Sequence, residues 1–396
     1  MITVDEARER ILRSLTATEA LPMKFQSALG RVLAADAVAA RTQPPFAASA
    51  MDGYAVRSAD MGDVPVTLDL VGESAAGHGF EGHLEPGTAA RISTGAPLPD
   101  GADQVVIQEK TERSGDRVTL ADTQRPMANV RSAGIDFREG DTLLRAGTRL
   151  TPEAIALAAG AGLTSLSVHR QPRVGIVSTG DELVEPGQSA GPHQIINSVS
   201  KGIDALVREW GGEPVYLGIA RDTPASVRDT LARGGDLDLV VTIGGASVGD
   251  HDHLRQVFND EGGALDFEKI AIKPGKPTWF GQLRGVPHLG LPGNPVSALV
   301  IARLLLRPAV TRLNGAAATT LFETATLDAD LSANDHRETY LRSSRTADGR
   351  VAPLSNQDSS ALSALVRANC LIRRTINAKA ARRGDLVEIL TLDGRD

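Results

Sequence analysis

The residues best suited to chemistry lie in three short glycine-containing segments. STGDE (178–182), IGGASVGDHD (243–252) and LPGNP (291–295) each combine glycine with hydroxyl, amide or carboxylate side chains, and each follows a short apolar run typical of a buried strand. Ligands of open α/β sheets bind beyond the carboxyl ends of the strands, where glycine permits close approach to the backbone. One such loop alone would indicate only a turn, but three after successive strands predict a shared ligand crevice.

Two lysines occupy a stiff segment between the second and third loops. In AIKPGKP (271–277), Lys273 and Lys276 are separated by a proline and a glycine. Their ammonium groups are compact point charges, which suits both of them to one oxyanion. Two solvated lysines with no ligand are the alternative interpretation.

Several acids accompany these lysines, namely Asp52, Asp181, Glu182, Asp222, Asp250 and Asp252. Carboxylates near lysines fit a phosphate held through Mg²⁺, because that hard cation takes carboxylate, phosphate and water oxygens. Each acid could instead cap a helix, and Asp250 or Asp252 before HLRQVF is the clearest case. His251 and His253 flank Asp252, but without cysteine partners or an HExxH pair they do not favour a transition-metal site.

Asp52 lies in a constrained segment, PPFAASAMDGYAV (44–56). Pro44 and Pro45 fix their φ angles and lack backbone donors, so the segment is neither a helix interior nor a central strand. It is expected to be a stiff loop. Asp52 and Gly53 also form an ordinary turn pair, so a turn without function remains the alternative.

Other common catalytic patterns are missing from the sequence. It contains no GxxxxGK[ST] segment and no strand-linked GxGxxG, which argues against a P-loop enzyme and a simple dehydrogenase. It also contains no GxSxG, and its single cysteine, Cys370, lies in an apolar run. Nucleophilic catalysis by serine or cysteine therefore has no support.

The composition indicates a globular protein of several domains. A chain of 396 residues, 41% hydrophobic and 23% charged, exceeds the size of one core and predicts two to four domains. Its net charge of −7 gives no general attraction to nucleic acid or an anionic membrane. One cysteine, no signal-like start and no apolar run near ~20 residues lead us to expect a cytoplasmic protein without a membrane partner.

The periodicity of the sequence changes along the chain. Thr3 with Glu6 predicts a capped first helix, and Thr151 with Pro152 predicts the start of another. Short alternating runs between 66 and 120 predict a β-rich insert. From 173 onward, strand and helix signals alternate, which implies a parallel sheet with helices on both faces. The tail returns to strand signals and predicts a small barrel or sandwich.

These signals predict a multidomain α/β plus β architecture. It consists of an N-terminal helical and linker domain (1–46 with 140–171), an inserted β-rich domain (47–139), a central doubly wound α/β domain (172–315) and a C-terminal β-barrel-like domain (316–396).

The ordered motifs resemble the molybdopterin molybdotransferase family, of the MoeA and gephyrin E-domain type. The resemblance rests on PPFAASAMDGYAVR, RISTGAPLPDGAD, RVGIVSTGDELVEPG, QIINS, GGASVGDHDH, AIKPGKP, GLPGNPVSAL and NQDSSALSAL, which together span essentially the whole chain. It implies a homodimer of four-domain subunits with a MogA-like α/β domain. The implied reaction inserts molybdenum from molybdate into adenylylated molybdopterin, with Mg²⁺ and release of AMP.

The resemblance also implies roles for individual residues. The implied catalytic residues are Asp52, Glu182, Asp222 and Asp252, with Asp52 and Asp252 as metal ligands and Asp52 delivered into a site built mainly from another domain. Substrate binding is implied for Thr94, Gly95, Thr179, Gly180, Asp181, Gly244, Gly245, Ser247, Lys273, Lys276, Pro292, Gly293, Asn294, Pro295, Arg342, Ser359 and Ser360. Ser247 and Asp252 would lie near the scissile phosphate, and Arg342 with Ser359 or Ser360 would form the molybdate pocket.

The chain departs from the family pattern at several positions. Ala47 and Ala48 replace a frequent Asp and Asn, Val199 and Lys201 interrupt the INSNSY pattern, and Ile135 replaces an acid. Two alternative functions are the adenylyltransferase that activates molybdopterin and a gephyrin-like peptide-binding scaffold. Contacts with other molybdenum cofactor synthesis proteins are a further expectation.

Overall fold

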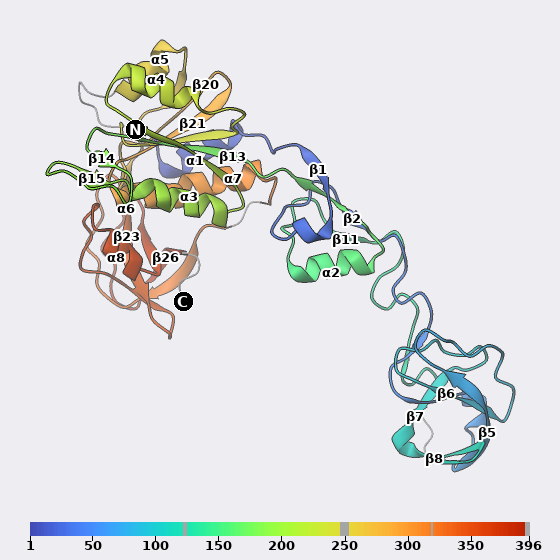
Figure 1. Ribbon diagram of the computed structural model, residues 1–396. Coiled ribbons are helices and arrows are strands. Elements are labelled where there is room, and N and C mark those ends of the chain that lie inside the picture. The colour runs from blue at the N-terminus through green and yellow to red at the C-terminus, as the bar shows by residue number, and fades with distance from the viewer. Residues whose placement is uncertain (122–124, 246–252, 318–319, 393–396) are drawn as a thin grey trace.

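The computed structural model describes residues 1–121, 125–245, 253–317 and 320–392. Figure 1 shows an elongated molecule, with the inserted β-rich domain at one end and the α/β and C-terminal domains at the other. Two chain segments connect the ends through a small domain that carries α2 (Pro152–Gly160). No helix in the described ranges is long and apolar enough to span a bilayer.

The α/β domain is built on a six-stranded sheet of mixed direction. Its strand order is β16-β13-β17-β21-β20-β18, in which the first four strands are parallel and the last two run antiparallel to their neighbours. The strands are β13 (Arg173–Thr179), β16 (Glu213–Ala220), β17 (Leu239–Ile243), β18 (Ala264–Phe267), β20 (Trp279–Leu283) and β21 (Val286–Leu291). The sequence predicted the parallel strands but not the β20–β21 hairpin.

Helices cover both faces of this sheet, as the alternating core residues require. Val174 and Ile176 of β13 belong to one cluster with α3, α6 and α7, whereas Val177 belongs to a second cluster with α4 and α5. The helices are α3 (Val199–Glu209), α4 (Pro224–Ala232), α5 (His253–Asp260), α6 (Pro295–Ile301) and α7 (Arg307–Leu313), with a π-helical turn (Ala302–Leu306) between the last two. The doubly wound prediction is therefore confirmed.

The first helix, α1 (Val4–Arg13), begins at the predicted cap: Thr3 accepts a hydrogen bond from the Glu6 backbone N–H at 3.1 Å. We expected it to belong with residues 1–46, yet Val4, Ala7 and Ile11 pack in the main core of the α/β domain. The capping pair predicted where this helix begins, but it carried no information about which domain the helix would cover.

The small connecting domain joins distant parts of the chain. Its antiparallel ladders pair β1 (Ala20–Met23) with β12 (Leu166–His169), and β2 (Ala37–Val38) with β11 (Thr142–Leu144). Thr151 caps α2 by accepting a hydrogen bond from the Ala154 backbone N–H at 3.2 Å, as the sequence predicted. Farther out, β3 (Ala48–Ser49) pairs with β10 (Val130–Arg131).

The inserted domain is a six-stranded sheet with the order β7-β4-β6-β5-β9-β8. These strands are β4 (Gly53–Val56), β5 (Val66–Ser74), β6 (Thr88–Ile92), β7 (Gln104–Ile107), β8 (Thr111–Ser114) and β9 (Arg117–Leu120). Alternate residues of β4 enter two different clusters, Tyr54 and Val56 in one and Ala55 in the other, so both faces of this strand are buried.

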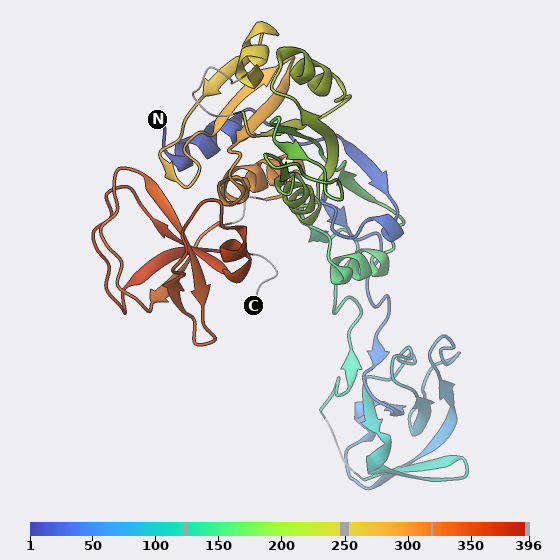
Figure 2. The ribbon, with the colours of Figure 1, turned by 60° about the vertical axis from the view of Figure 1, so that its left-hand side comes forward.

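The C-terminal domain forms a closed five-stranded barrel. Its order is β23-β24-β22-β26-β25, and β25 also pairs with β23 to complete the ring. The strands are β22 (Glu323–Leu327), β23 (Glu338–Arg345), β24 (Arg350–Pro353), β25 (Cys370–Arg374) and β26 (Leu386–Thr391). Figure 2 shows this barrel beside the α/β domain, and α8 (Leu362–Arg367) lies between them through contacts with α6 and β23.

Candidate functional site

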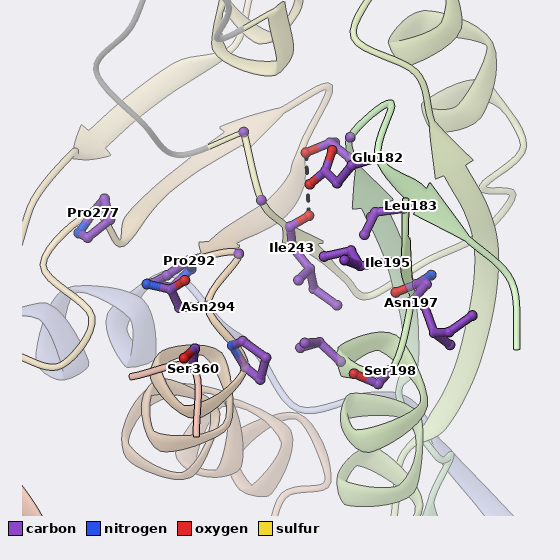
Figure 3. A pocket seen from close by; sticks show the side chains of 18 of the residues that line it. Glu182, Leu183, Ile195, Asn197, Ser198, Ile243, Pro277, Pro292, Asn294 and Ser360 are labelled. Carbon is purple, nitrogen blue, oxygen red and sulfur yellow. Dashed lines mark hydrogen bonds between the residues drawn. The ribbon is translucent and has the colours of Figure 1, made fainter. Parts of the chain in front are cut away.

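The principal cleft lies at the carboxyl ends of the parallel strands, where the sequence predicted a ligand crevice. It encloses about 930 Å³, a volume within the usual range for small-molecule sites. Its lining residues are Thr179, Gly180, Glu182, Leu183, Ile195, Ile196, Asn197, Ser198, Val199, Asp222, Ile243, Gly244, Gly245, Lys269, Lys276, Pro277, Pro292, Gly293, Asn294, Pro295 and Ser360. Figure 3 shows how side chains from these loops surround the space.

The topology of the sheet explains this location. From β13 the chain moves to β16 on one side and then crosses to β17 on the other side of β13. The loops after β13 and β17 therefore diverge, which is the arrangement that opens a crevice in doubly wound sheets. All three predicted glycine-containing loops meet there, insofar as their residues are described.

Glycine is required where the loop after β17 approaches the loop after β13. Gly244 has a φ of +88°, and a Cβ atom there would lie 2.8 Å from the Thr179 carbonyl oxygen and 2.9 Å from Thr179 Oγ1. Both the conformation and the space exclude a larger residue without rearrangement. The two strand ends are thereby held in close contact at the bottom of the cleft.

Acidic residues stand on the rim beside α4. Glu182 and Asp222 line the cleft, and the Asp222 backbone N–H donates to Asp181 Oδ1 at 3.2 Å. The Asp181 backbone N–H donates in return to Asp222 Oδ2 at 3.3 Å. Arg221 supports the same loop because its Nη1 donates to the Asp181 carbonyl oxygen at 3.0 Å. These bonds fix the loop that carries the acids.

The lysines are arranged differently from the expectation. Lys276 lines the cleft together with Lys269, which the sequence argument did not select. Lys273 lies on β19 (Ile272–Lys273), which pairs with β23 of the barrel, and is not among the lining residues. Its charge instead helps to lower the pKa of Asp335, although hydrogen bonding from the Arg337 backbone is the main cause of that shift.

The C-terminal domain contributes Ser360 to the cleft. Asn294 Nδ2 donates to Ser359 Oγ at 3.2 Å, and the Val296 backbone N–H donates to the Ser359 carbonyl oxygen at 3.1 Å. The NQDSSALSAL motif is thus bound to the LPGNP motif. Ser360 also donates from its backbone N–H and its Oγ to Asp358 Oδ1, at 2.8 and 2.6 Å, which orients the loop.

Arg342 lies behind this loop rather than in the cleft lining. Its side chain is 1% exposed, and its Nε has no hydrogen-bond partner among the described residues. Burial lowers the pKa of the guanidinium, an effect that the nearby Asp358 carboxylate opposes. A buried guanidinium with an unused donor is suited to a nearby anion.

Asp52, Thr94 and Gly95 form a separate group in the inserted domain. The backbone N–H and the Oγ1 of Thr94 donate to Asp52 Oδ1 at 2.7 and 2.9 Å, which lowers the pKa of that carboxyl. The Gly95 backbone N–H donates to the Ser49 carbonyl oxygen at 2.8 Å. None of the three lines the cleft, and Figure 1 shows their domain far from it within the chain.

Ser247, Asp250, His251 and Asp252 lie outside the described residues, so their predicted roles stay predictions. Of the other predicted residues, Thr179, Gly180, Glu182, Asp222, Gly244, Gly245, Lys276, Pro292, Gly293, Asn294, Pro295 and Ser360 come together in the cleft. Asp181 and Ser359 are bonded to lining residues without lining the cleft themselves.

Sequence reasoning missed one whole wall of the cleft. Leu183, Ile195 and Ile196 lie on the paired strands β14 (Leu183–Val184) and β15 (Ile195–Ile196), followed by Asn197. The QIINS motif was the available signal, but its isoleucines gave no chemical reason to assign them to a site.

The fold and the cleft place this chain among the doubly wound α/β proteins, whose usual ligand position is the switch point of the sheet. Comparison with known families makes the assignment specific. The description "MoeA N-terminal region (domain I and II)" matches residues 2–162, "Probable molybdopterin binding domain" matches 175–312, and "MoeA C-terminal region (domain IV)" matches 324–392. The chain belongs to the molybdopterin molybdenumtransferase family.

Individual relatives agree with this assignment. The chain is 39% identical over 320 residues to a protein of Haemophilus influenzae named molybdopterin molybdenumtransferase, covering 80% of this chain and 78% of the relative. It is 37% identical to a protein of the same name from Nostoc sp., covering 80% and 74%. Among solved structures, a molybdopterin biosynthesis MoeA protein from Pyrococcus horikosii is similar with a TM-score of 0.86 and 30% identity, covering 100% of both chains.

Proposed function

We infer that this chain is a molybdopterin molybdenumtransferase that inserts molybdenum into molybdopterin during molybdenum cofactor biosynthesis. The inference rests on family membership combined with the cleft at the switch point of the sheet. Two lysines and two acids line this cleft, together with backbone of the glycine-containing loops. The matched regions lie on both sides of the α/β domain, which favours this enzyme over an adenylyltransferase consisting of the α/β domain alone.

We further propose that the substrate is adenylylated molybdopterin and that AMP leaves after molybdate has reacted. Lys269 and Lys276 line the cleft and are available to neutralise phosphate oxygens there. Ser360 and Asn294, with Arg342 behind them, support a molybdate position where the barrel meets the α/β domain. Among the described residues we find no observation that favours a peptide-binding scaffold.

Mg²⁺ is the proposed cofactor. No group of three or more His, Cys, Asp or Glu side chains among the described residues is arranged to hold a metal. Mg²⁺ does not need such a group, because it commonly binds one or two carboxylates together with substrate phosphates and water. Glu182 and Asp222 on the rim fit that requirement. When bound, the ion would neutralise charge on the phosphates, while the chain's own residues orient them.

A homodimer is also proposed, with Asp52 serving the partner's cleft. Asp52 lies outside the cleft of its own chain, and a second copy of the chain could deliver it into the partner's cleft. Refolding Asp52→Ala with Glu182→Ala gives hybrids with one site that carries both substitutions and one that carries neither. Random pairing makes about half of the dimers hybrid, so activity should recover to about a quarter of wild type. No recovery, with hybrids present by native mass spectrometry, would contradict a shared site.

The central experiment follows AMP release from adenylylated molybdopterin with molybdate and Mg²⁺. We expect release that depends on molybdate, and Lys276→Gln should lower the rate at limiting substrate because one cleft cation is lost. Lys24→Gln, an exposed lysine of the connecting domain, is the matched charge control. AMP release without any dependence on molybdate would contradict the proposed reaction, and formation of adenylylated molybdopterin from ATP would favour the adenylyltransferase.

A further inference from the structure

The cleft has two chemically different walls. One wall is apolar and contains Leu183, Ile195, Ile196 and Val199. The other carries Pro277, Pro292, Asn294 and Ser360, with Lys276 next to Pro277 in the chain. Figure 3 shows Leu183 and Ile195 on the side of the cleft opposite Pro292, Asn294 and Ser360. A ligand that fills this space therefore meets apolar carbon at one side and polar or cationic groups at the other.

Two residues of the apolar wall are exposed although they are large and aliphatic. Ile195 is 58% exposed and Ile196 is 41% exposed, so the chain itself does not cover them. Both belong to β15, which pairs in parallel with β14. The Ile195 backbone N–H donates to the Glu182 carbonyl oxygen at 2.8 Å, and the Asn197 backbone N–H donates to the Val184 carbonyl oxygen at 2.8 Å. The two isoleucines are held in place by this pairing.

A polar cluster behind the wall holds the residue that follows it. Asn197 is 3% exposed; its Nδ2 donates to Tyr216 Oη at 2.9 Å, and its Oδ1 accepts from Ser178 Oγ at 3.1 Å. Tyr216 Oη in turn donates to the Glu185 carboxylate. Asn197 is therefore bonded on both sides, to β13 and to β16.

Lys201 completes the cluster. Its Nζ lies 3.1 Å from Glu185 Oε2 and 4.0 Å from the centroid of the Tyr216 ring. An ammonium group over an aromatic face is attracted by the ring, and here it also pairs with a carboxylate. This lysine, which interrupts the INSNSY pattern, connects α3 to the strand that bears Tyr216 and to the residue that follows β14.

We propose that Leu183 and Ile195, which are register partners in the β14–β15 pairing and therefore share one face of it, bind the face of a planar heteroaromatic ring in the substrate, with the attached phosphate directed toward Lys269 and Lys276. A flat ring can cover two neighbouring aliphatic side chains on one face of the pairing, and this burial is favourable because the chain leaves Ile195 exposed and Leu183 only partly covered. The Ser198 hydroxyl, which also lines the cleft, can accept or donate at the polar edge of the ring. Glu185, Lys201 and Tyr216 are positioning residues. The proposal rests on the proposed function, whose substrate carries an adenine and a pterin, and either ring has this chemistry.

The test measures ring binding without enzyme turnover. Calorimetry with AMP and with ribose 5-phosphate separates the ring from the phosphate, and pterin-6-carboxylate, followed by its fluorescence, supplies the other ring. The Leu183→Ala/Ile195→Ala variant should lose at least tenfold in affinity for one of the two ring ligands, equivalent to about 1.4 kcal/mol. Its affinity for ribose 5-phosphate should stay within about twofold of wild type, since the phosphate contacts are intact.

Three further variants separate the effects of direct contact, side-chain positioning and charge. Leu386→Ala changes an aliphatic residue that is 72% exposed on a barrel strand, and it should alter neither ligand. Tyr216→Phe removes the Oη that links Asn197 to Glu185, and it should lower the preference for the ring ligand over ribose 5-phosphate by about threefold, a smaller effect than loss of the contact itself. Lys276→Gln should weaken AMP and ribose 5-phosphate together.

The outcomes are distinct. Loss of AMP binding in the Leu183→Ala/Ile195→Ala variant assigns the wall to adenine, and loss of pterin-6-carboxylate binding assigns it to the pterin. If wild-type protein binds AMP no better than ribose 5-phosphate and does not bind pterin-6-carboxylate, or if both ring ligands bind the variant unchanged, the assignment is overturned. If either negative result is found and AMP release still depends on molybdate, only the ring-binding proposal is wrong. If AMP release does not depend on molybdate, the proposed function is wrong.

Discussion

The α/β domain should lose stability in mild acid because of one buried histidine. His288 on β21 is 4% exposed, and its ring lies 5.4 Å from that of Phe258. Burial lowers the pKa of His288 to about 4, although hydrogen bonding to the Val286 carbonyl oxygen works in the opposite direction. In the unfolded chain the pKa of a histidine is about 6.5. The folded state therefore binds this proton more weakly than the unfolded state.

The sign and size of the effect follow from this difference. As pH falls below about 6.5, the unfolded chain gains a proton that the folded domain does not accept, so the free energy of unfolding decreases. The loss is complete once pH falls below about 4 and amounts to about 3 kcal/mol, from 1.4 kcal/mol for each pH unit between the two pKa values. Between pH 7 and pH 5 it should be about 2 kcal/mol.

Urea unfolding followed by tryptophan fluorescence measures this effect. Both tryptophans, Trp210 and Trp279, are buried in the α/β domain, so the signal reports on that domain. His288→Phe removes the titrating group, and the fall in unfolding free energy between pH 7 and pH 5 should be about 2 kcal/mol smaller than in wild type. His193→Phe, an exposed histidine of the same domain, is the control. Equal falls in wild type and His288→Phe would refute the assignment of the acid sensitivity to His288.

The remaining predictions concern single contacts. Gly244→Ala should destabilise the α/β domain by about 2 to 4 kcal/mol in urea unfolding, because backbone strain at φ +88° adds to the collision with Thr179. Gly235→Ala, which adds a methyl group in open space, is the control and should change the urea midpoint little. Arg170 donates to both oxygens of Asp238 at 2.9 Å, so Arg170→Met should cost about 1 to 3 kcal/mol in thermal unfolding, and an unchanged midpoint would contradict this. Asp52→Asn should leave the circular dichroism spectrum unchanged, because the amide oxygen can still accept from Thr94, yet turnover should fall; full activity would exclude a role for its charge.

The glycine positions and the strand-end loops were predictable from the sequence. Apolar runs followed by glycine predicted β13, β17 and β21 and the crevice at their ends, because burial on both faces of a parallel sheet imposes that pattern. The caps at Thr3 and Thr151 were equally predictable, since each depends on hydrogen bonds within a few residues.

The other features of the site depend on contacts between residues that are far apart in the sequence. Lys273 and Lys276 are close in sequence, but β19 pairs with the barrel and only Lys276 lines the cleft with Lys269. The packing of α1 on the α/β core and the closure of the barrel through β23 and β25 also depend on partners far along the chain. Local sequence patterns specify an element and its apolar face, whereas the surface that covers the face is chosen by the total burial of the folded chain.

The apolar wall illustrates the same limit. Ile195 and Ile196 would ordinarily be assigned to a core, because isoleucine is among the most buried residues. In the folded chain they lie on the short pairing of β14 with β15, where no other segment covers them fully. The sequence by itself determined the family, the strand ends and the glycine loops, since these rest on local backbone requirements. Only the tertiary structure determined which side chains face the cleft, because that depends on which segments the fold places side by side.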